Sequence, residues 1–197
     1  MNNDIIFNQL FDKINHYIKK EDLIKYRTPT ELKKEINLSI DENGVSQHEF
    51  LDLLDKYLDY SVNTNNSQFL NQLYSGFNFP AFVGEIFTAL TNTSMYTYEV
   101  APVATLIETE MIQLMNSYAG YTDGDGIFVS GGSNANLIAM FSARNHFYPK
   151  IRHEGYDKNL KLRAFVNENA HYSFANAANV IGIGTDSLIK VKANENG

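Results

Sequence analysis

The chain has 197 residues, 44% of them hydrophobic and 20% charged, which is the composition of a globular protein. Its 16 Lys and Arg against 23 Asp and Glu give a formal net charge of -7. This balance argues against a general binder of nucleic acid or of an anionic membrane, because both need a basic face. Cysteine is absent, which excludes a disulfide framework, a thiolate nucleophile and a cysteine-based metal site. Without a long apolar run or a secretory signal, the chain is expected to be cytoplasmic.

The first part of the chain, residues 1–62, has helical patterning throughout. Apolar residues at helical spacing predict an amphipathic helix over residues 5–18. Two capping-box sequences, at residues 28–31 and 46–49, predict the starts of two further helices, the first with proline at its opening position. We expect residues 1–62 to form a helical segment used for packing or dimerisation.

The second part, residues 63–197, begins in an Asn- and Ser-rich loop and then alternates between helical and strand-like patterns. Strands that alternate with helices are typical of a parallel α/β unit. The expected elements are helices at about 81–90 and 100–118, a strand at 126–129, a helix at 135–147, a strand at 164–166, a helix at 174–180 and a strand at 188–191.

A glycine pair lies at the turn from the third of these elements into the fourth, in the sequence Ser130-Gly131-Gly132-Ser133-Asn134-Ala135-Asn136. A strand that turns through glycines into a helix brings free backbone N–H groups and the positive helix end to one point, which suits a phosphate. Side chains of Ser133 and Asn136 can add hydrogen bonds. The sequence is neither a Walker loop nor a dinucleotide fingerprint, so a phosphate site and a plain turn remain equally open on these residues alone.

His171 follows the predicted strand at 164–166. Residues just beyond the carboxyl end of a parallel strand lie where α/β sheets bind ligands. An imidazole at that place can stack on a planar ring or move a proton, although a lone histidine is more often an ordinary helix-start or surface residue.

Four segments, at residues 69–76, 92–102, 124–144 and 170–187, resemble the pyridoxal-phosphate-dependent group II amino-acid decarboxylases. The resemblance is to the branch that acts on glutamate, cysteine sulfinate and aspartate, and the segments occur in that family's order and near its spacing. It implies an α/β fold in which N-terminal helices precede the first part of a fold-type I large domain with a mainly parallel sheet.

The resemblance also implies a cofactor, pyridoxal 5'-phosphate, and a reaction, decarboxylation of a small acidic L-amino acid by a homodimeric enzyme. Its roles fall on the following residues: Gly132 and Ser133 hold the cofactor phosphate with Asn136 close by, His171 stacks on the pyridine ring and assists proton transfer, Asn71 and Gln72 lie near the substrate carboxylate, and Ser94 and Tyr96 line the substrate side.

Substrate choice stays open on the sequence. Ser94, Tyr96 and Tyr74 look more like the cysteine-sulfinate and aspartate members than like glutamate decarboxylases. No metal site is expected.

The family's Schiff-base lysine, the aspartate that partners the pyridine nitrogen and the arginine that meets the substrate carboxylate would all come after Gly197. We therefore expect this sequence to be the N-terminal portion of a decarboxylase and to be inactive alone. Three interpretations remain: a truncated or split enzyme, a non-catalytic partner that regulates a full-length decarboxylase, and a module that binds a phosphate-bearing ligand without chemistry.

Overall fold

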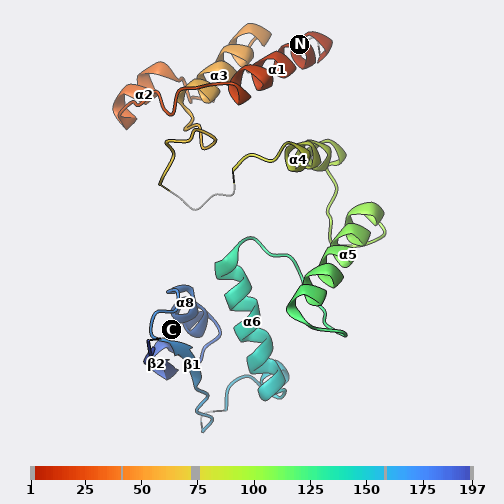
Figure 1. Cartoon of the computed structure of the whole chain (residues 1–197), viewed down its shortest axis with the longest axis vertical. Helices are drawn as coiled ribbons and strands as arrows, with labels where there is room; N and C mark the ends of the chain where they lie inside the picture. The colour runs from red at the N-terminus through yellow and green to blue at the C-terminus, as the bar shows by residue number, and fades with distance from the viewer. Residues whose placement is uncertain (1–2, 41, 72–75, 158, 196–197) are drawn as a thin grey trace. The chain divides into compact units, whose positions relative to one another are not determined.

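The computed structural model describes residues 3–40, 42–71, 76–157 and 159–195 (Figure 1). The chain forms two compact units, Met1–Asn92 and Thr93–Gly197, and each is described by itself. The expected domain boundary between residues 62 and 63 stays a prediction.

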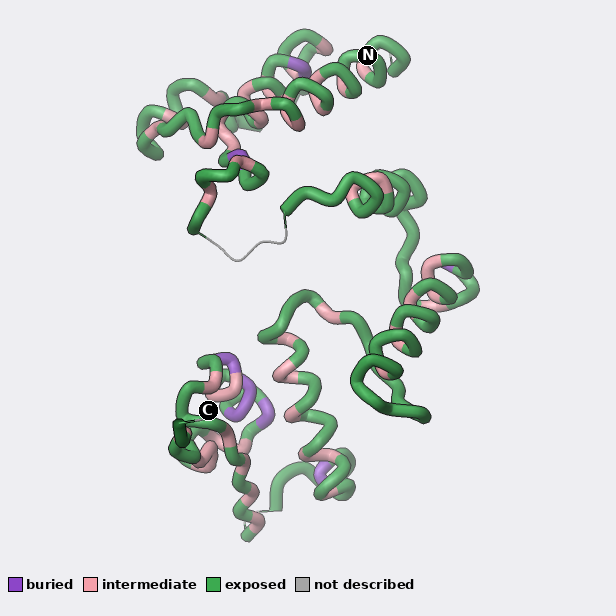
Figure 2. Tube along the Cα trace, viewed as in Figure 1, coloured by how far each residue is buried: buried purple, intermediate pink, exposed green. Residues whose placement is uncertain are grey.

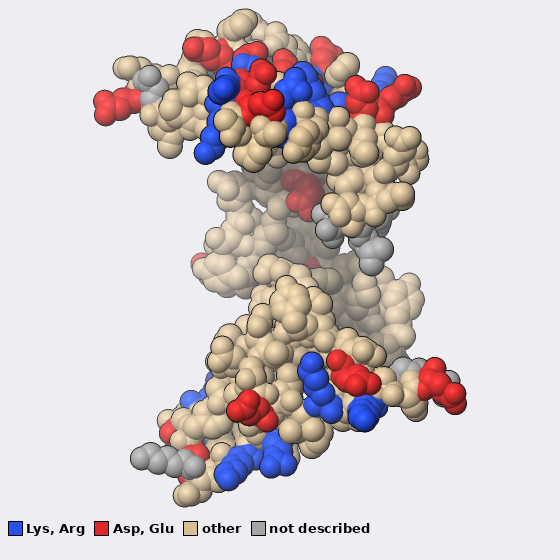
Figure 3. All heavy atoms as spheres, turned by 90° about the vertical axis from the view of Figure 1, so that its left-hand side faces the viewer, with Lys and Arg blue, Asp and Glu red and all other residues tan. Residues whose placement is uncertain are grey.

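The N-terminal unit is helical in its described part. It contains α1 (Asn3–Ile18), α2 (Pro29–Glu35), α3 (Gln47–Tyr60) and α4 (Phe79–Thr91). Helix α1 packs against α3, and an ion pair between Lys13 and Asp55 joins the two helices. Charged side chains of both signs lie together over the N-terminal helices, at the top of Figure 3.

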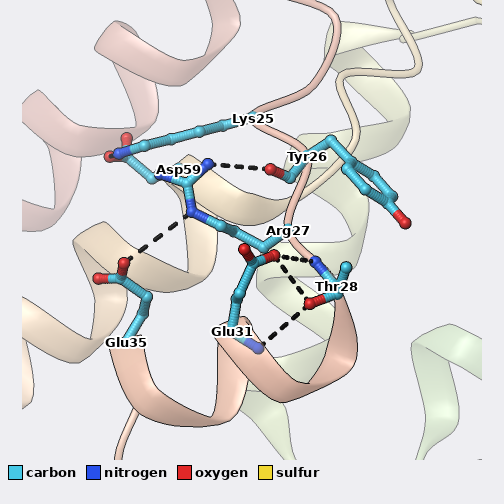
Figure 4. A network of polar contacts seen from close by, with 7 residues as sticks. All are labelled: Lys25, Tyr26, Arg27, Thr28, Glu31, Glu35 and Asp59. Carbon is cyan, nitrogen blue, oxygen red and sulfur yellow. Dashed lines mark hydrogen bonds and ion pairs between the residues drawn. The ribbon is translucent and has the colours of Figure 1, made fainter.

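Both predicted capping boxes are confirmed. Thr28 Oγ1 accepts the Glu31 N–H at 3.3 Å while the Glu31 carboxylate accepts the Thr28 N–H at 2.9 Å, so two N–H groups at the start of α2 are satisfied (Figure 4). Ser46 and Glu49 make the same reciprocal pair at the start of α3.

Asn63 joins the segment after α3 to the segment after α1. Its side chain is 2% exposed, and its Nδ2 donates to the Lys20 carbonyl oxygen at 2.7 Å. Its backbone N–H donates to the Leu23 carbonyl at 2.8 Å. A buried amide that satisfies backbone groups in this way fixes the course of a loop that has few apolar contacts.

The C-terminal unit contains a β–α–β arrangement. Its elements are α5 (Pro102–Ala119), α6 (Gly132–Phe147), α7 (Ile151–Glu154), β1 (Ala164–Asn167), α8 (Ser173–Val180), the 3-10 turn η1 (Thr185–Ser187) and β2 (Leu188–Val191). Strands β1 and β2 pair in parallel, from Ala164 opposite Leu188 to Asn167 opposite Val191, and each keeps one outer edge without a strand neighbour among the described residues.

Helix α8 carries most of the core of this unit. Ala177 and Ala178 are 2% and 0% exposed, and their small side chains let α8 lie directly against α6. At the end of α8, the Ile181 carbonyl accepts hydrogen bonds from the Arg144 guanidinium and from the Tyr156 hydroxyl. Figure 2 shows the buried positions gathered around α8, with few elsewhere.

The predicted strand at 126–129 is wrong. The segment is extended but lies outside any strand of the described chain, and Ile127 and Phe128 are 63% and 57% exposed. The Phe128 N–H donates to the Glu108 carboxylate on α5 at 3.3 Å and not to a neighbouring strand. An apolar run becomes a strand only where a neighbour completes its hydrogen-bond ladder, and none of the described residues does so here.

The remaining predicted elements are confirmed to within a few residues, and Gly120 ends α5 in the left-handed conformation as expected. The four-residue helix α7 and the turn η1 were not predicted. No helix within the described ranges combines the length and the apolar character that a membrane crossing requires.

Candidate functional site

The candidate site begins where the chain turns through Gly131 into α6. Gly131 has φ 98°, a conformation open to glycine and strained for other residues. Its N–H donates back to the Val129 carbonyl at 2.7 Å, and its own carbonyl accepts the N–H groups of Asn134 and Ala135, each at 3.1 Å. The turn is therefore closed by backbone bonds, and Gly131 starts the helix without a side-chain cap.

The next two N–H groups, those of Gly132 and Ser133, have no acceptor within the part of the chain that the structure describes. Both residues are exposed, and a Cβ added at Gly132 would meet nothing within 4 Å. Packing within the chain gives no reason for a glycine at position 132. An external group that approaches the backbone closely does give one, and the first turn of a helix suits a phosphate.

Three side chains connect this helix start to the loop after β1. The Asn136 Nδ2 donates to the Ser173 hydroxyl at 2.8 Å, and that hydroxyl lies 2.9 Å from Nδ1 of His171. Asn136 lies one turn into α6 and Ser173 opens α8, so the packing of these two helices brings the glycine turn and His171 into one region of the unit.

The His171 ring is held from one side. Its Nδ1 also accepts the backbone N–H of Ser173 at 3.2 Å, and the Tyr172 ring lies 4.2 Å away between centroids, tilted by 38°. The first contact satisfies an N–H at the start of α8, which is a structural role for the ring. The residue itself is exposed, and Nε2 has no hydrogen-bond partner among the residues described.

A small open cavity of about 240 Å³ lies between the starts of the two helices. Neither Gly132 nor His171 lines it, but their immediate neighbours Ser133 and Ser173 both do. The full lining consists of Ser133, Asn134, Leu137, Ser173, Asn176, Ala177 and Val180.

The residues expected at the substrate are not brought to this region by any described contact. Asn71 is exposed and belongs to the N-terminal unit, and Gln72 and Tyr74 lie outside the described residues. Ser94 and Tyr96 lie in the segment between α4 and α5 and are exposed, Tyr96 by 81%. Their expected roles stay predictions.

Ser173 is the residue that the sequence reasoning missed. It is 2% exposed and links Asn136 to His171. A local signal was present, because a serine at the start of a helix and two residues after a histidine is placed to bond with that histidine. The partner on α6 could not be found locally, since it lies 37 residues earlier in the chain.

Comparison with known proteins agrees with this geometry. Residues 29–197 match the pyridoxal-dependent decarboxylase conserved domain. Cysteine sulfinic acid decarboxylase from Mus musculus is 38% identical over 177 residues, which cover 90% of this chain and 36% of that protein. Acidic amino acid decarboxylase from Homo sapiens is 37% identical over 177 residues, which cover 90% of this chain and 34% of that protein.

The fold agrees as well. The crystal structure of mouse CSAD superposes on the whole chain with a TM-score of 0.89 at 33% identity, and the match covers 43% of that structure's chain. The expected fold class, N-terminal helices followed by the first part of the large domain of such an enzyme, is confirmed. The chain spans about a third of the length of the curated relatives that it matches.

Proposed function

Since the chain belongs to the pyridoxal-dependent decarboxylase family, we propose that it provides the phosphate cradle and the ring-covering histidine of an enzyme that decarboxylates an acidic L-amino acid. The observation that carries the proposal is the hydrogen-bonded connection from Asn136 through Ser173 to His171. It joins the two features that a pyridoxal phosphate site needs, an anion-binding helix start and an aromatic ring at a strand end.

The phosphate of the cofactor is held at the start of α6. The N–H groups of Gly132 and Ser133 donate to it, the Ser133 hydroxyl adds a hydrogen bond, and the positive end of the helix favours its charge. The Asn136 Nδ2 donates to the Ser173 hydroxyl and so ties this helix start to α8. Hydrogen bonds to a charged group contribute about 1.5–3 kcal/mol each.

His171 covers the cofactor ring and carries a proton at Nε2. When bound, pyridoxal phosphate supplies an electron-accepting ring, which stabilises the charge left at the α-carbon when carbon dioxide departs. The imidazole excludes water from that face of the ring. It is also the group in the described chain that is placed to hold a proton near the reacting carbon.

The substrate is an acidic amino acid such as cysteine sulfinate, aspartate or glutamate. Two relatives whose names specify cysteine sulfinic acid and acidic amino acids support this class. Asn71, Gln72, Ser94 and Tyr96 contact the substrate in the proposed enzyme. A homodimer in the cytoplasm is part of the same proposal.

A second function has separate support in the amount of apolar surface that the chain exposes. Side chains such as Leu106 and Ile107 on α5 are 54% and 58% exposed, as expected of surfaces that pack against further polypeptide. As the alternative, the chain acts without catalysis as a binding or regulatory partner of a full-length decarboxylase.

The phosphate cradle is tested by equilibrium dialysis of pyridoxal 5'-phosphate against the 197-residue chain, with pyridoxal, which lacks the phosphate, as the comparison ligand. Gly132→Glu places a carboxylate in the cradle, and we expect it to weaken binding of the phosphate form about 10- to 100-fold, equivalent to one charge-assisted hydrogen bond. Ser142→Glu adds the same charge at an exposed position farther along α6 and is the matched control. Equal binding of both ligands, or no effect of Gly132→Glu, would contradict the proposal.

The two functions are separated by measuring carbon dioxide release from cysteine sulfinate, aspartate and glutamate. We expect none from the 197-residue chain alone, because the family's lysine is not among its residues in a matching context. Addition of the chain to a full-length decarboxylase distinguishes the alternatives: a changed rate supports the regulatory function, and an unchanged rate argues against it.

A further inference from the structure

We propose that Asn136 and Ser173 form a one-way hydrogen-bond relay that keeps Nδ1 of His171 as an acceptor and its proton on Nε2. This inference deepens the proposed function, on which its chemical use rests. It makes Asn136 and Ser173 positioning residues that act through the imidazole and need not touch the cofactor or the substrate themselves.

The direction of the relay is set at its histidine end by a backbone group. The Ser173 N–H lies 3.2 Å from Nδ1, and a backbone N–H can only donate. Nδ1 therefore accepts, and the proton of the neutral ring lies on Nε2. A proton on Nδ1 would point two N–H groups at each other and leave one of them without a partner at the start of α8.

The Ser173 hydroxyl continues the same direction. It has one proton, and it lies 2.9 Å from Nδ1 and 2.8 Å from the Asn136 Nδ2. Since Nδ1 accepts, the hydroxyl proton goes to the imidazole and its oxygen receives an N–H from the Asn136 amide. All three contacts are satisfied with a single arrangement of protons.

Burial makes this arrangement selective. Ser173 is 2% exposed, so solvent does not offer its hydroxyl an alternative partner of equal quality. His171 is exposed as a residue, and its Nε2 has no hydrogen-bond partner within the described part of the chain. The relay thus keeps the N–H on the ring nitrogen that does not bond to Ser173.

The substitution Asn136→Asp tests the direction, because a carboxylate can accept the Ser173 proton but cannot donate to its oxygen. The hydroxyl then turns from Nδ1 toward the carboxylate, and its lone pair faces the ring. We expect Nδ1 to lose the hydrogen bond from the hydroxyl and to keep the one from the Ser173 backbone N–H. Asn134→Asp is the matched control: it adds a carboxylate to the same helical turn, where the native side chain donates to the Ser130 hydroxyl at 3.4 Å and, among the described residues, makes no hydrogen bond to Ser173.

The readout is the pair of imidazole ¹⁵N chemical shifts in the full chain labelled with ¹⁵N-histidine, recorded at a pH at which the ring is neutral. A His171→Gln sample identifies the signals. We expect an acceptor-type Nδ1 in the native chain, in Asn134→Asp and in Asn136→Asp, and in Asn136→Asp alone a shift of its signal toward that of a ring nitrogen that accepts one hydrogen bond fewer. Native-like signals in Asn136→Asp, or a donor-type Nδ1 in the native chain, would overturn the relay.

Ser173 is tested by a pair of variants. Ser173→Ala removes the hydroxyl, and we expect the ring signals to become insensitive to Asn136→Asp; Ser173→Thr retains the hydroxyl, and we expect the sensitivity to return. Persistence of the Asn136→Asp effect in Ser173→Ala would contradict the relay. These measurements need no cofactor, so their failure is distinct from a failure of phosphate binding at Gly132.

Discussion

At the scale of single residues, Arg144 holds the end of α8 against α6. A helix leaves its last carbonyl groups without internal partners and carries partial negative charge at that end. The Arg144 guanidinium supplies both a donor to the Ile181 carbonyl and a positive charge, and it stacks 4.9 Å from the Phe141 ring and 5.8 Å from the Tyr156 ring. Several weak contacts therefore converge on one side chain that spans two helices.

We expect Arg144→Met to expose the backbone amides of α8 more often to solvent. The methionine keeps most of the apolar contact but loses the donor and the charge, which together contribute about 1–3 kcal/mol. Hydrogen exchange of the α8 amides measures the effect directly. Arg152→Met, on the exposed side of α7, is the control, and equal exchange in both variants would show that the Ile181 contact is unimportant.

The buried amide of Asn63 gives a second test at this scale. Asn63→Asp replaces the donor that faces the Lys20 carbonyl at 2.7 Å with an oxygen, so two acceptors meet in a site that is 2% exposed. We expect a loss of about 1–3 kcal/mol in the free energy of unfolding of the N-terminal unit, measured by urea denaturation. Asn65→Asp makes the same chemical change at an exposed neighbour and should have little effect.

At the scale of elements, the start of α2 depends on the ionised form of one carboxyl group. The hydrogen bonds from the Thr28 backbone and then from its hydroxyl lower the pKa of Glu31 below its ordinary value. A lowered pKa means that the folded state favours the charged form, so its contribution to stability is present above the ordinary pKa and is lost as the pH falls through the lowered one.

We therefore expect the amides in the first turn of α2 to lose protection on acidification, over the range that begins at the ordinary glutamate pKa of about 4.3 and extends below it. Glu31→Gln retains an oxygen that can accept the Thr28 N–H but does not ionise, and it should remove this pH dependence. Two-dimensional NMR of the amide signals between neutral and acidic pH makes the measurement. Identical titration of the native and substituted chains would show that Glu31 is not responsible.

The elements that could be predicted from the sequence are those with local signals. Capping boxes at Thr28 and Ser46 and the left-handed glycine after α5 lie within a few residues of the helix ends that they define. The segment 126–129 has an equally clear apolar pattern but needs a neighbouring strand, and such a partner is a property of the fold and not of the segment.

The candidate site also contains features that the sequence predicts and a contact that it does not predict. The glycine turn and His171 are visible in the sequence because each sits at the end of a predicted element. The bond from Asn136 to Ser173 joins residues on two helices, and its existence depends on how closely α8 approaches α6. The family resemblance named both ends of this connection but not the hydroxyl between them.

At the scale of the whole molecule, the exposed area of 16087 Å² is large for the mass of 22.3 kDa. Two separate globular units of this combined mass would expose only about 11,000 Å². Two globular units in contact would expose less area than two separate ones, so the expected area for separate units is an upper value. The excess of the exposed area over this value therefore does not depend on how the units are placed. Much of the surface is apolar, and α5 has no buried residue along its length.

We expect the 197-residue chain to bind the dye ANS and to associate with itself as its concentration rises. Leu106→Lys charges an apolar position on α5 that is 54% exposed, so it should reduce both effects while leaving helix content unchanged. Thr109→Lys adds the same charge to an exposed polar position of that helix as a control. Dye fluorescence and light scattering provide the measurements. Equal values for the native chain, Leu106→Lys and Thr109→Lys would argue against self-association through the apolar surface of α5.

The two outer edges of the β1–β2 pair differ in how well they resist fibrous assembly. Lys190 lies within β2, and a charge of this kind discourages edge-to-edge growth. Phe165 on β1 is 67% exposed, and β1 contains no charged residue. We therefore expect edge-to-edge assembly to start along β1. Phe165→Lys is the first substitution to make when a preparation that resists precipitation is wanted.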